Sequence, residues 1–307
     1  MTVTVLGGGG FIGTHVSHGL VKSGFDVRVF GRHFLDRSLL AGAELFEGDF
    51  NDETVLATAL QDTDIIIHLI HATFPTVANV EMIADIERSV MGSVRMLEAA
   101  RANGVKRIIF FSSGGTVYGP TAQTPISETA ATNPIGAYGI NKLAIEKYVA
   151  LFERLHGIEG FVLRLANPFG PLQTGRRQQG LIPNVYSKIK NYRKVPIYGD
   201  GSNIRDYIYI DDVVSSVHRI IEYNGYERCF NVGSATRGKT IIDVVKSIEN
   251  SCGVRADLEF LPSRSFDVPE NVLCCQRLID QTNWRPTVAF DTGIERTIRW
   301  LENHAAM

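Results

Sequence analysis

A tyrosine and a lysine four residues apart, Tyr138 and Lys142, are the side chains in this sequence best suited to catalysis. Residues at this spacing share one face of a helix. A phenol with a pKa of about 10 is a poor base at neutral pH unless a nearby cation stabilises the phenolate, and Lys142 supplies that cation. The pair is suited to removing a hydroxyl proton while hydride leaves the same carbon. Taken alone, such a pair is more often an exposed pair that has no catalytic role.

Three glycines near the start of the chain predict where the acceptor of that hydride would bind. Gly7, Gly10 and Gly13 stand between an apolar strand at 3–6 and a helix at 12–23. In a β-α-β unit such glycines let the backbone approach a pyrophosphate, and the first amides of the helix point at its charge. The pattern predicts a dinucleotide site, with a glycine-rich turn that only packs helix on strand as the alternative.

These residues belong to a regular alternation of short β-branched segments and helical patterns. The expected strands are 3–6, 26–30, 43–46, 64–69, 107–112 and 161–165, and the expected helices are 12–23, 52–60, 83–103 and 137–156. Such alternation predicts parallel strands joined by crossover helices. We therefore expect an α/β fold, a doubly wound parallel sheet of the Rossmann type that binds the dinucleotide over residues 1–167.

The second half of the chain carries briefer elements and more glycine, proline and arginine. We expect strands at 195–198, 207–210 and 256–260 and helices near 211–223, 240–252 and 291–304. Residues 168–307 are predicted to form mainly a smaller α/β substrate-binding region. Segments near 204–232 are expected to return to the Rossmann part.

Composition narrows the class of protein. The chain has 307 residues, a formal net charge of -2 and no clustered stripe of Lys and Arg, which argues against a nucleic-acid or anionic membrane partner. Its apolar runs have strand length, far short of a bilayer span. The first strand starts two residues after Met1, which leaves no room for a secretory signal. None of the four cysteines has CxxC spacing; they are Cys229, Cys252, Cys274 and Cys275. We therefore expect reduced thiols and no metal site, and the lack of a secretory signal predicts a cytoplasmic location.

Several motifs together support a closer interpretation. They are Gly7 to Gly13, Gly48-Asp49, His68-Leu69, Ser112 to Gly119, Tyr138 to Lys142, Gly199-Asp200-Gly201 and Arg205-Asp206-Tyr207. The set resembles an extended short-chain dehydrogenase/reductase of the nucleotide-sugar epimerase/dehydratase group, over essentially the whole chain. The resemblance implies that Tyr138 is the general base and acid, and that Lys142 lowers its pKa and binds the nicotinamide ribose.

The same resemblance implies a cofactor site. Its members would be Gly7, Gly10, Phe11, Ile12, Gly13, Arg32, Asp49, Phe50, Leu69, Ala72, Tyr138 and Lys142. Asp49 would meet the adenine, and the turn at Ala72 would pass near the cofactor. His68 and His71 follow a buried strand, where a histidine is more often a core residue than a catalyst.

One departure from the family pattern concerns catalysis. The usual third catalytic hydroxyl would stand at Gly114, which has no side chain. Thr116 lies two residues further on, so an extended loop would aim it to the same side, whereas Ser113 should point away. We favour Thr116 as the third catalytic residue, with a threonine that only caps the loop as the alternative.

A second departure from the family pattern concerns the cofactor. At the end of the second strand, where NAD-specific members carry an acid, this chain has Gly31 and Arg32. No carboxylate there would repel a 2′-phosphate, so the cofactor is expected to be NAD with NADP as an open possibility. Arg32 could instead stack on adenine or remain solvated.

A third departure lies in the helix expected at 83–103. Ser89 stands where the family commonly has Asn before Gly92, which should change only local hydrogen bonding.

The resemblance also assigns a substrate side. Asn167, Arg205 and Arg264 would lie at the diphosphate, Ile197 beside the base, and Ser113 near the sugar. Guanidinium groups suit phosphate oxygens because they can donate two parallel hydrogen bonds. Residues 173–180 would form either a loop over the sugar or a polar connector. A homodimer through the helices near 83–103 and 137–156 is implied, although their apolar faces could equally pack within one chain.

Three functions fit these residues. The leading interpretation is a nucleotide-sugar 4-epimerase, with UDP-sugar as substrate, that oxidises C4, lets the 4-keto sugar rotate and returns the hydride. A dehydratase would carry an Asp-Glu pair where this chain has Gly115 and Thr116, so dehydration is disfavoured. The alternatives are an NADPH-dependent reductase of a 4-keto-deoxy nucleotide sugar and a non-catalytic protein that binds NAD(P) as a sensor or interaction module.

Overall fold

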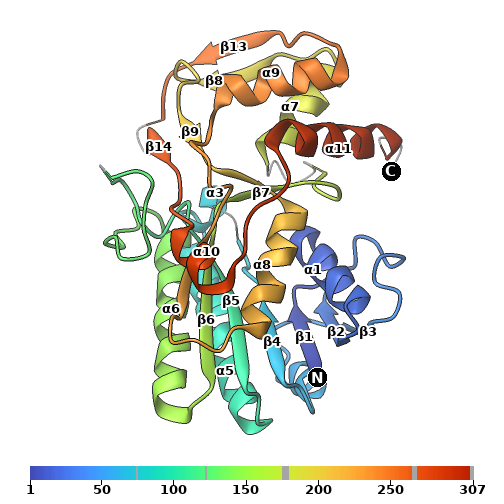
Figure 1. Ribbon diagram of the computed structural model, residues 1–307, viewed down its shortest axis with the longest axis vertical. Coiled ribbons are helices and arrows are strands. Elements are labelled where there is room, and N and C mark those ends of the chain that lie inside the picture. Colours follow the sequence, from blue (N-terminus) through green and yellow to red (C-terminus); the bar gives the residue numbers. More distant parts are fainter. Residues whose placement is uncertain (74, 122, 175–179, 265–267, 305–307) are drawn as a thin grey trace.

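A seven-stranded parallel sheet forms the centre of the molecule (Figure 1). The computed structural model describes residues 1–73, 75–121, 123–174, 180–264 and 268–304. The strand order is β11-β6-β5-β4-β1-β2-β3. The strands are β1 (Thr2–Leu6), β2 (Asp26–Gly31), β3 (Glu44–Glu47), β4 (Ile65–His68), β5 (Arg107–Ser113), β6 (Glu159–Leu165) and β11 (Cys229–Val232). All neighbouring pairs run parallel, which confirms the predicted doubly wound α/β fold.

Helices cover both faces of this sheet because its strands are apolar on both faces. Along β4, Ile65 and Ile67 join one buried cluster with α1 (Phe11–Lys22) and α8 (Ile210–Glu222). Ile66, which points to the opposite face, joins a second cluster. That cluster also holds side chains of α2 (Glu53–Leu60), α5 (Gly92–Ala102) and α6 (Ala137–His156). The period of two along a strand thus separates the two halves of the core.

The helix expected over 83–103 is in fact three segments. α4 (Met82–Asp85) leads into η1 (Ile86–Met91), a π-helical turn, and α5 continues from Gly92. The hydrogen bonds of a π-helix span one more residue than those of an α-helix, which local apolar periodicity does not reveal. The helix expected at 137–156 has the predicted bounds and ends at Gly157, whose φ of 72° suits glycine.

The second region is built from short elements above the carboxyl ends of the strands (Figure 1). β8 (Val195–Tyr198) pairs with β13 (Leu258–Leu261), and β9 (Ile204–Arg205) pairs with β12 (Lys239–Thr240) and β14 (Glu270–Asn271). β7 (Asn167–Phe169) pairs with β10 (Tyr207–Tyr209) at the junction of the two regions. Its helices are α7 (Leu181–Lys190), α9 (Ile241–Cys252) and α11 (Phe290–Asn303). Helix α10 (Gln276–Thr282) instead packs against β11 of the sheet, and α3 (Pro75–Ala78) lies near the junction. Of these, α3, α7 and α10 were not among the expected helices.

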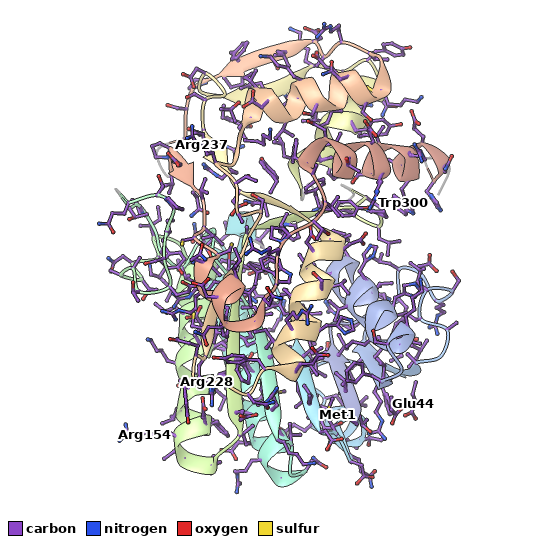
Figure 2. All side chains as sticks on the ribbon, viewed as in Figure 1. Met1, Glu44, Arg154, Arg228, Arg237 and Trp300 are labelled. Carbon is purple, nitrogen blue, oxygen red and sulfur yellow. The ribbon has the colours of Figure 1, made fainter. Side chains whose placement is uncertain are left out.

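The second half of the chain also contributes to the sheet itself. β11 pairs with β6 at the edge of the sheet, and α8 packs beside α1. In Figure 2, Met1, Glu44 and Arg154 lie toward the end of the molecule away from the second region, whereas Arg237 and Trp300 lie on the side of that region. All four cysteines are free thiols, as expected. Within the described ranges no helix is long and apolar enough to span a membrane.

Candidate active site

The residues predicted to do chemistry meet at the carboxyl ends of β1, β4 and β5 and at the start of α6. The strand order reverses between β1 and β4, and ligands of doubly wound folds bind at such a switch point. The loops after these two strands touch, because a Cβ on Gly7 would lie 3.1 Å from Ile70 Cγ1. Lys142 of α6 reaches the end of β5, where its Nζ donates a hydrogen bond of 2.7 Å to the carbonyl of Phe111.

The glycine loop has the shape that a pyrophosphate requires. Gly7 has a φ of +83°, and a Cβ on Gly13 would overlap the carbonyl of Gly7. Helix α1 begins after Gly10 without a side-chain cap and has no acidic residue in its first turn. The amides of Phe11, Ile12 and Gly13 therefore remain available to an anion at the helix start. The loop fits a dinucleotide. The residues that would hold its pyrophosphate are Gly7, Gly10, Phe11, Ile12 and Gly13.

At the adenine end, Arg32 and Asp49 lie together and exposed. Arg32 Nη1 is 4.0 Å from Asp49 Oδ2, and hydrogen bonds from Asn51, with the charge of Arg32, lower the pKa of the Asp49 carboxyl. An exposed pair of this length contributes little stability, so Arg32 stays free to reach a ligand. Phe50 differs from the two, since its ring is buried and stacks on His68 at 5.3 Å between centroids. The side chain of Phe50 therefore belongs to the core.

Tyr138 and Lys142 share one face of α6, as their spacing predicts. Lys142 is buried, and its Nζ lies 5.9 Å from the centroid of the Tyr138 ring. Burial lowers the pKa of Lys142 to about 7, against the opposing charges of Glu146 and Asp85. Burial, together with the charge of Asp85, raises the pKa of the Tyr138 phenol. Without further positive charge, the phenol is therefore protonated at neutral pH.

The position of the missing hydroxyl is filled by another side chain. A Cβ on Gly114 would overlap Leu273 Cδ1 and lie 3.0 Å from Leu273 Cδ2. The loop is not extended, because the amides of Thr116 and Val117 both donate to the carbonyl of Ser113. The alternation argument for Thr116 over Ser113 therefore does not apply. A different observation now favours Thr116, whose buried Oγ1 has no hydrogen-bonding partner among the described residues.

A cluster of polar side chains lies behind Tyr138. The ring of His71 meets the ring of Tyr138 edge-on, with centroids 4.4 Å apart. His71 Nε2 lies 3.3 Å from Asp85 Oδ1, and Asp85 accepts hydrogen bonds of 2.8 Å from Ser89 Oγ and Asn141 Nδ2. Ser89 also accepts from the amide of Ala72 at 3.0 Å, which links the loop that follows β4 to the π-helical turn. His71, expected as a core histidine, thus contacts the predicted base.

The predicted substrate residues lie at the junction and in the second region. Asn167 Nδ2 donates to the carbonyl of Asp206 at 2.8 Å, which places Asn167 beside Arg205. Arg264 is exposed, with Cζ 3.5 Å from the centroid of the Tyr198 ring. Ile197 is only 1% exposed, so its side chain belongs to the core of this region. Residues 175–179 of the predicted loop over the sugar lie outside the described residues.

Comparison with known proteins identifies the family. Residues 3–233 match the model of the NAD dependent epimerase/dehydratase family.

The chain belongs to the NAD-dependent epimerase/dehydratase family.

The relatives of this chain include enzymes of two activities. The dTDP-4-dehydro-6-deoxyglucose reductase of Escherichia coli is 34% identical over 76% of this chain and 73% of its own length. The UDP-glucose 4-epimerase of Thermotoga maritima, solved with UDP-glucose, superposes with a TM-score of 0.93 at 30% identity over 99% of this chain and all of its own. The Thermus thermophilus UDP-glucose 4-epimerase, solved with NAD, gives 0.89 at 27% identity, over 98% of this chain and 99% of that one.

Membership of the epimerase/dehydratase family confirms the resemblance seen in the sequence, and with it a nicotinamide-dependent enzyme. The family pattern gave no signal for His71 and Asp85. Asp85 could be found only from its neighbours in space, because it stands 56 residues before Asn141 in the chain. For His71 the one local sign is that a polar side chain stands shortly after the end of the buried strand β4.

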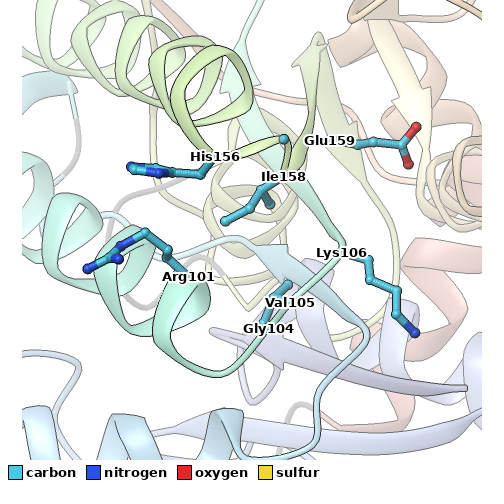
Figure 3. Close-up of a pocket in the computed structure, with 8 residues that line it drawn as sticks. Arg101, Gly104, Val105, Lys106, His156, Ile158 and Glu159 are labelled. Carbon is cyan, nitrogen blue, oxygen red and sulfur yellow. The ribbon is translucent and has the colours of Figure 1, made fainter.

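The hollow shown in Figure 3 is not part of this family's site. It measures about 440 Å³ and is lined by residues that include Arg101, Lys106, His156 and Glu159. Lys106 and Glu159 stand at the amino ends of β5 and β6, the opposite end of the sheet from Tyr138. Among the described residues no group of three or more His, Cys, Asp or Glu is arranged to hold a metal ion.

Proposed function

We propose that this protein is a UDP-sugar 4-epimerase that works by transient oxidation at C4 with NAD as its resident cofactor. The observation that carries the proposal is the Tyr138 and Lys142 pair at the switch point of the sheet, beside the loop shaped for a dinucleotide. The two epimerases of known structure reported above, one solved with UDP-glucose and one with NAD, support the choice of substrate and cofactor.

Each residue of the site has a role in this reaction. Tyr138 takes the proton of the C4 hydroxyl and later returns it, while Lys142 stabilises the phenolate and contacts the nicotinamide ribose. Thr116 donates a hydrogen bond from its otherwise unpartnered hydroxyl to the same C4 oxygen. The nicotinamide, when bound, accepts the hydride and gives it back. Leu69 and Ala72, after β4, flank the cofactor.

The second region holds the nucleotide diphosphate. Arg205 and Arg264 supply guanidinium groups to the phosphates, and Asn167 donates the second N–H of its side-chain amide, since the first is bonded to the carbonyl of Asp206. Ser113, at the end of β5, lies near the sugar, and β8 with Ile197 supports the base. Because these groups bind parts of the substrate that do not react, they govern affinity more than the chemical step.

A second candidate, an NADPH-dependent reductase of a 4-keto-deoxy nucleotide sugar, is favoured by one observation. Arg32 is exposed and only loosely paired with Asp49, so its guanidinium can bind a 2′-phosphate. The reductase of Escherichia coli among the relatives supports it as well. A protein that only binds the cofactor is the third possibility, and the intact Tyr138 and Lys142 pair argues against it.

One experiment separates these functions. The purified protein is denatured, the released nucleotide is identified by mass spectrometry, and intact protein is incubated with UDP-glucose, UDP-galactose and their N-acetyl forms. Near-stoichiometric NAD and interconversion of one pair support the epimerase. An empty site that prefers NADPH, with reduction of a 4-keto-6-deoxy sugar nucleotide and no epimerisation, would replace it with the reductase.

We also propose a homodimer, in the cytosol, built on an exposed apolar surface. The surface comprises Met82, Ile83, Ile86, Met91, Ile140, Tyr148, Leu151 and Leu155, from α4, η1 and α6. An apolar stripe along neighbouring helices marks an interaction site rather than a solvated face. Leu151→Glu is expected to shift sedimentation velocity from dimer to monomer, whereas Tyr192→Glu, an exposed residue outside this surface, should leave the dimer intact.

A further inference from the structure

Asp85 is a buried charged group next to the proposed base, and the reaction above gives it no task. The carboxylate is 0% exposed. It is held by three groups from three elements, which are His71 after β4, Ser89 in the π-helical turn and Asn141 on α6. A buried carboxylate costs folding free energy unless it is fully hydrogen-bonded, and a charge kept at an active site under that cost calls for an explanation.

His71 does not cancel this charge. Its side chain is 5% exposed, and neither of its ring nitrogens makes a hydrogen bond of good geometry among the described residues. Burial lowers the pKa of His71 to about 4, against the opposing effect of Asp85. At neutral pH the imidazole is therefore neutral. The His71 ring contacts the Tyr138 ring and lies 3.3 Å from Asp85 Oδ1. Despite the burial of the Asp85 carboxyl, hydrogen bonds hold its pKa well below its usual value, so the carboxylate keeps its negative charge.

The other ionisable groups around Tyr138 leave two charges that matter. Lys142 is the cation on the same face of α6, and Glu146 one turn further on is paired with Arg164 at 2.7 Å. His68 on β4 is buried, and burial lowers its pKa well below its ordinary value, so it is neutral too. Lys142 favours the phenolate of Tyr138 and Asp85 disfavours it, because like charges in a shared site oppose each other.

We propose that Asp85 is a positioning residue for the reaction, whose buried charge opposes that of Lys142 and holds Tyr138 protonated, ready to donate its proton to a 4-keto sugar. The inference rests on the proposed function, in which Tyr138 exchanges a proton with the C4 oxygen. In the donating step the O–H bond of Tyr138 breaks, hydride from the reduced nicotinamide bonds to C4, and the proton bonds to the C4 oxygen. The site is thereby biased toward reduction, which keeps the keto intermediate short-lived in an epimerase and is the whole reaction in a reductase.

Asp85→Asn is the direct test because an amide can keep all three contacts. With its nitrogen in the place of Oδ1, the amide donates to Ser89 Oγ and to His71 Nε2, and its oxygen still accepts from Asn141 Nδ2. Asp212→Asn is the matched control. Asp212 is a buried carboxylate of α8 that accepts from the amides of Thr287 and Val288, away from Tyr138. Asp85→Ser removes the same charge if the amide is not tolerated.

The primary measurement is the alkaline titration of Tyr138 in the protein with its cofactor. The tyrosinate absorbance is recorded for the parent protein and for each Asp85 variant. From each curve the absorbance of the same protein with Tyr138→Phe added is subtracted, which leaves the signal of Tyr138. Lys142 is present in the parent protein and in every variant, so a difference between their titrations reports the loss of the Asp85 charge. Without Asp85 the tyrosinate signal should develop about one pH unit lower, and the acid limb of the kcat profile should move the same way. Asp212→Asn should move neither.

An unchanged or higher titration range in both Asp85 variants would overturn the proposal, even if kcat falls, because a packing defect lowers kcat without moving the phenol's titration. The titration needs no sugar substrate. If no sugar nucleotide is turned over but the tyrosinate signal still shifts, the proposed function fails and the effect of Asp85 on Tyr138 stands.

Discussion

The predicted functional residues of the sheet region and of the second region differ in how far they are buried and bonded. At the sheet, Lys142 stands on α6 and is bonded to the carbonyl of Phe111, and the hydroxyl of Thr116, in the turn after β5, is buried. In the second region, Arg264 is exposed on a segment between short strands. Catalytic groups need fixed geometry, and sites on helices and strands provide it better than loops. From this difference we expect the first region to perform the chemistry and the second to select the substrate.

Tyr138→Phe tests whether the sheet region performs the chemistry, and it should have the largest effect. Loss of the phenol removes general acid and base catalysis, so kcat should fall roughly 10²- to 10⁴-fold, while the nucleotide released on denaturation stays the same. Tyr118→Phe is the control, since its buried hydroxyl donates to Asn231 Oδ1 at 2.7 Å. That variant should lose about 1 kcal/mol of stability and keep its turnover. Unchanged turnover in Tyr138→Phe would remove the catalytic assignment.

Thr116→Val sharpens the comparison with a smaller effect. Because Thr116 Oγ1 is buried without a partner among the described residues, its removal should leave the melting temperature unchanged or slightly higher. The value of kcat should fall about 10-fold, through loss of one hydrogen bond to the C4 oxygen. Ser113→Ala is the matched measurement. A larger loss of kcat in Ser113→Ala than in Thr116→Val would make Ser113 the replacement for the hydroxyl absent at Gly114.

Arg264→Ala tests the second half of the comparison and should have the smallest effect. Loss of one guanidinium contact to a phosphate should raise KM for the sugar nucleotide about 10-fold, with kcat changed less than about 2-fold. Arg255→Ala in the same region, whose partner is Glu249, should change neither. A fall in kcat without a change in KM would place Arg264 in the chemistry rather than in substrate binding.

The fold could be predicted where local pattern determines structure, and less well elsewhere. Strands such as Ile65–His68 are short β-branched runs, and α6 carries one continuous apolar face with glycine at both ends. Helix α7 was missed because Gly180 and Pro183 suggest a loop, although proline is tolerated in a first turn. The π-helical turn at Ile86–Met91 was missed because tertiary contacts, not periodicity, decide the register of its hydrogen bonds.

The candidate site, like the fold, could be predicted from the sequence only where its residues are close together in the chain. Tyr138, Lys142 and the glycine loop are close in sequence and could be recognised from spacing. Leu273 fills the space beside Gly114 although the two residues are far apart in the chain, and no single-sequence pattern encodes this contact. The contact of His71 with Tyr138 is of this second kind. Residue type could suggest a role for His71, but only the packing of the loop after β4 against α6 reveals its partner.

Strand β11 has a consequence for how this protein must be made. It seals the outer edge of β6, whose residues are almost all buried. During synthesis the sheet stays open along that edge until the chain has passed Val232, with a row of unpaired amides and carbonyls beside apolar side chains. Such an edge recruits strands from other molecules. A fragment that stops near residue 167 is therefore expected to aggregate rather than serve as an isolated cofactor-binding unit.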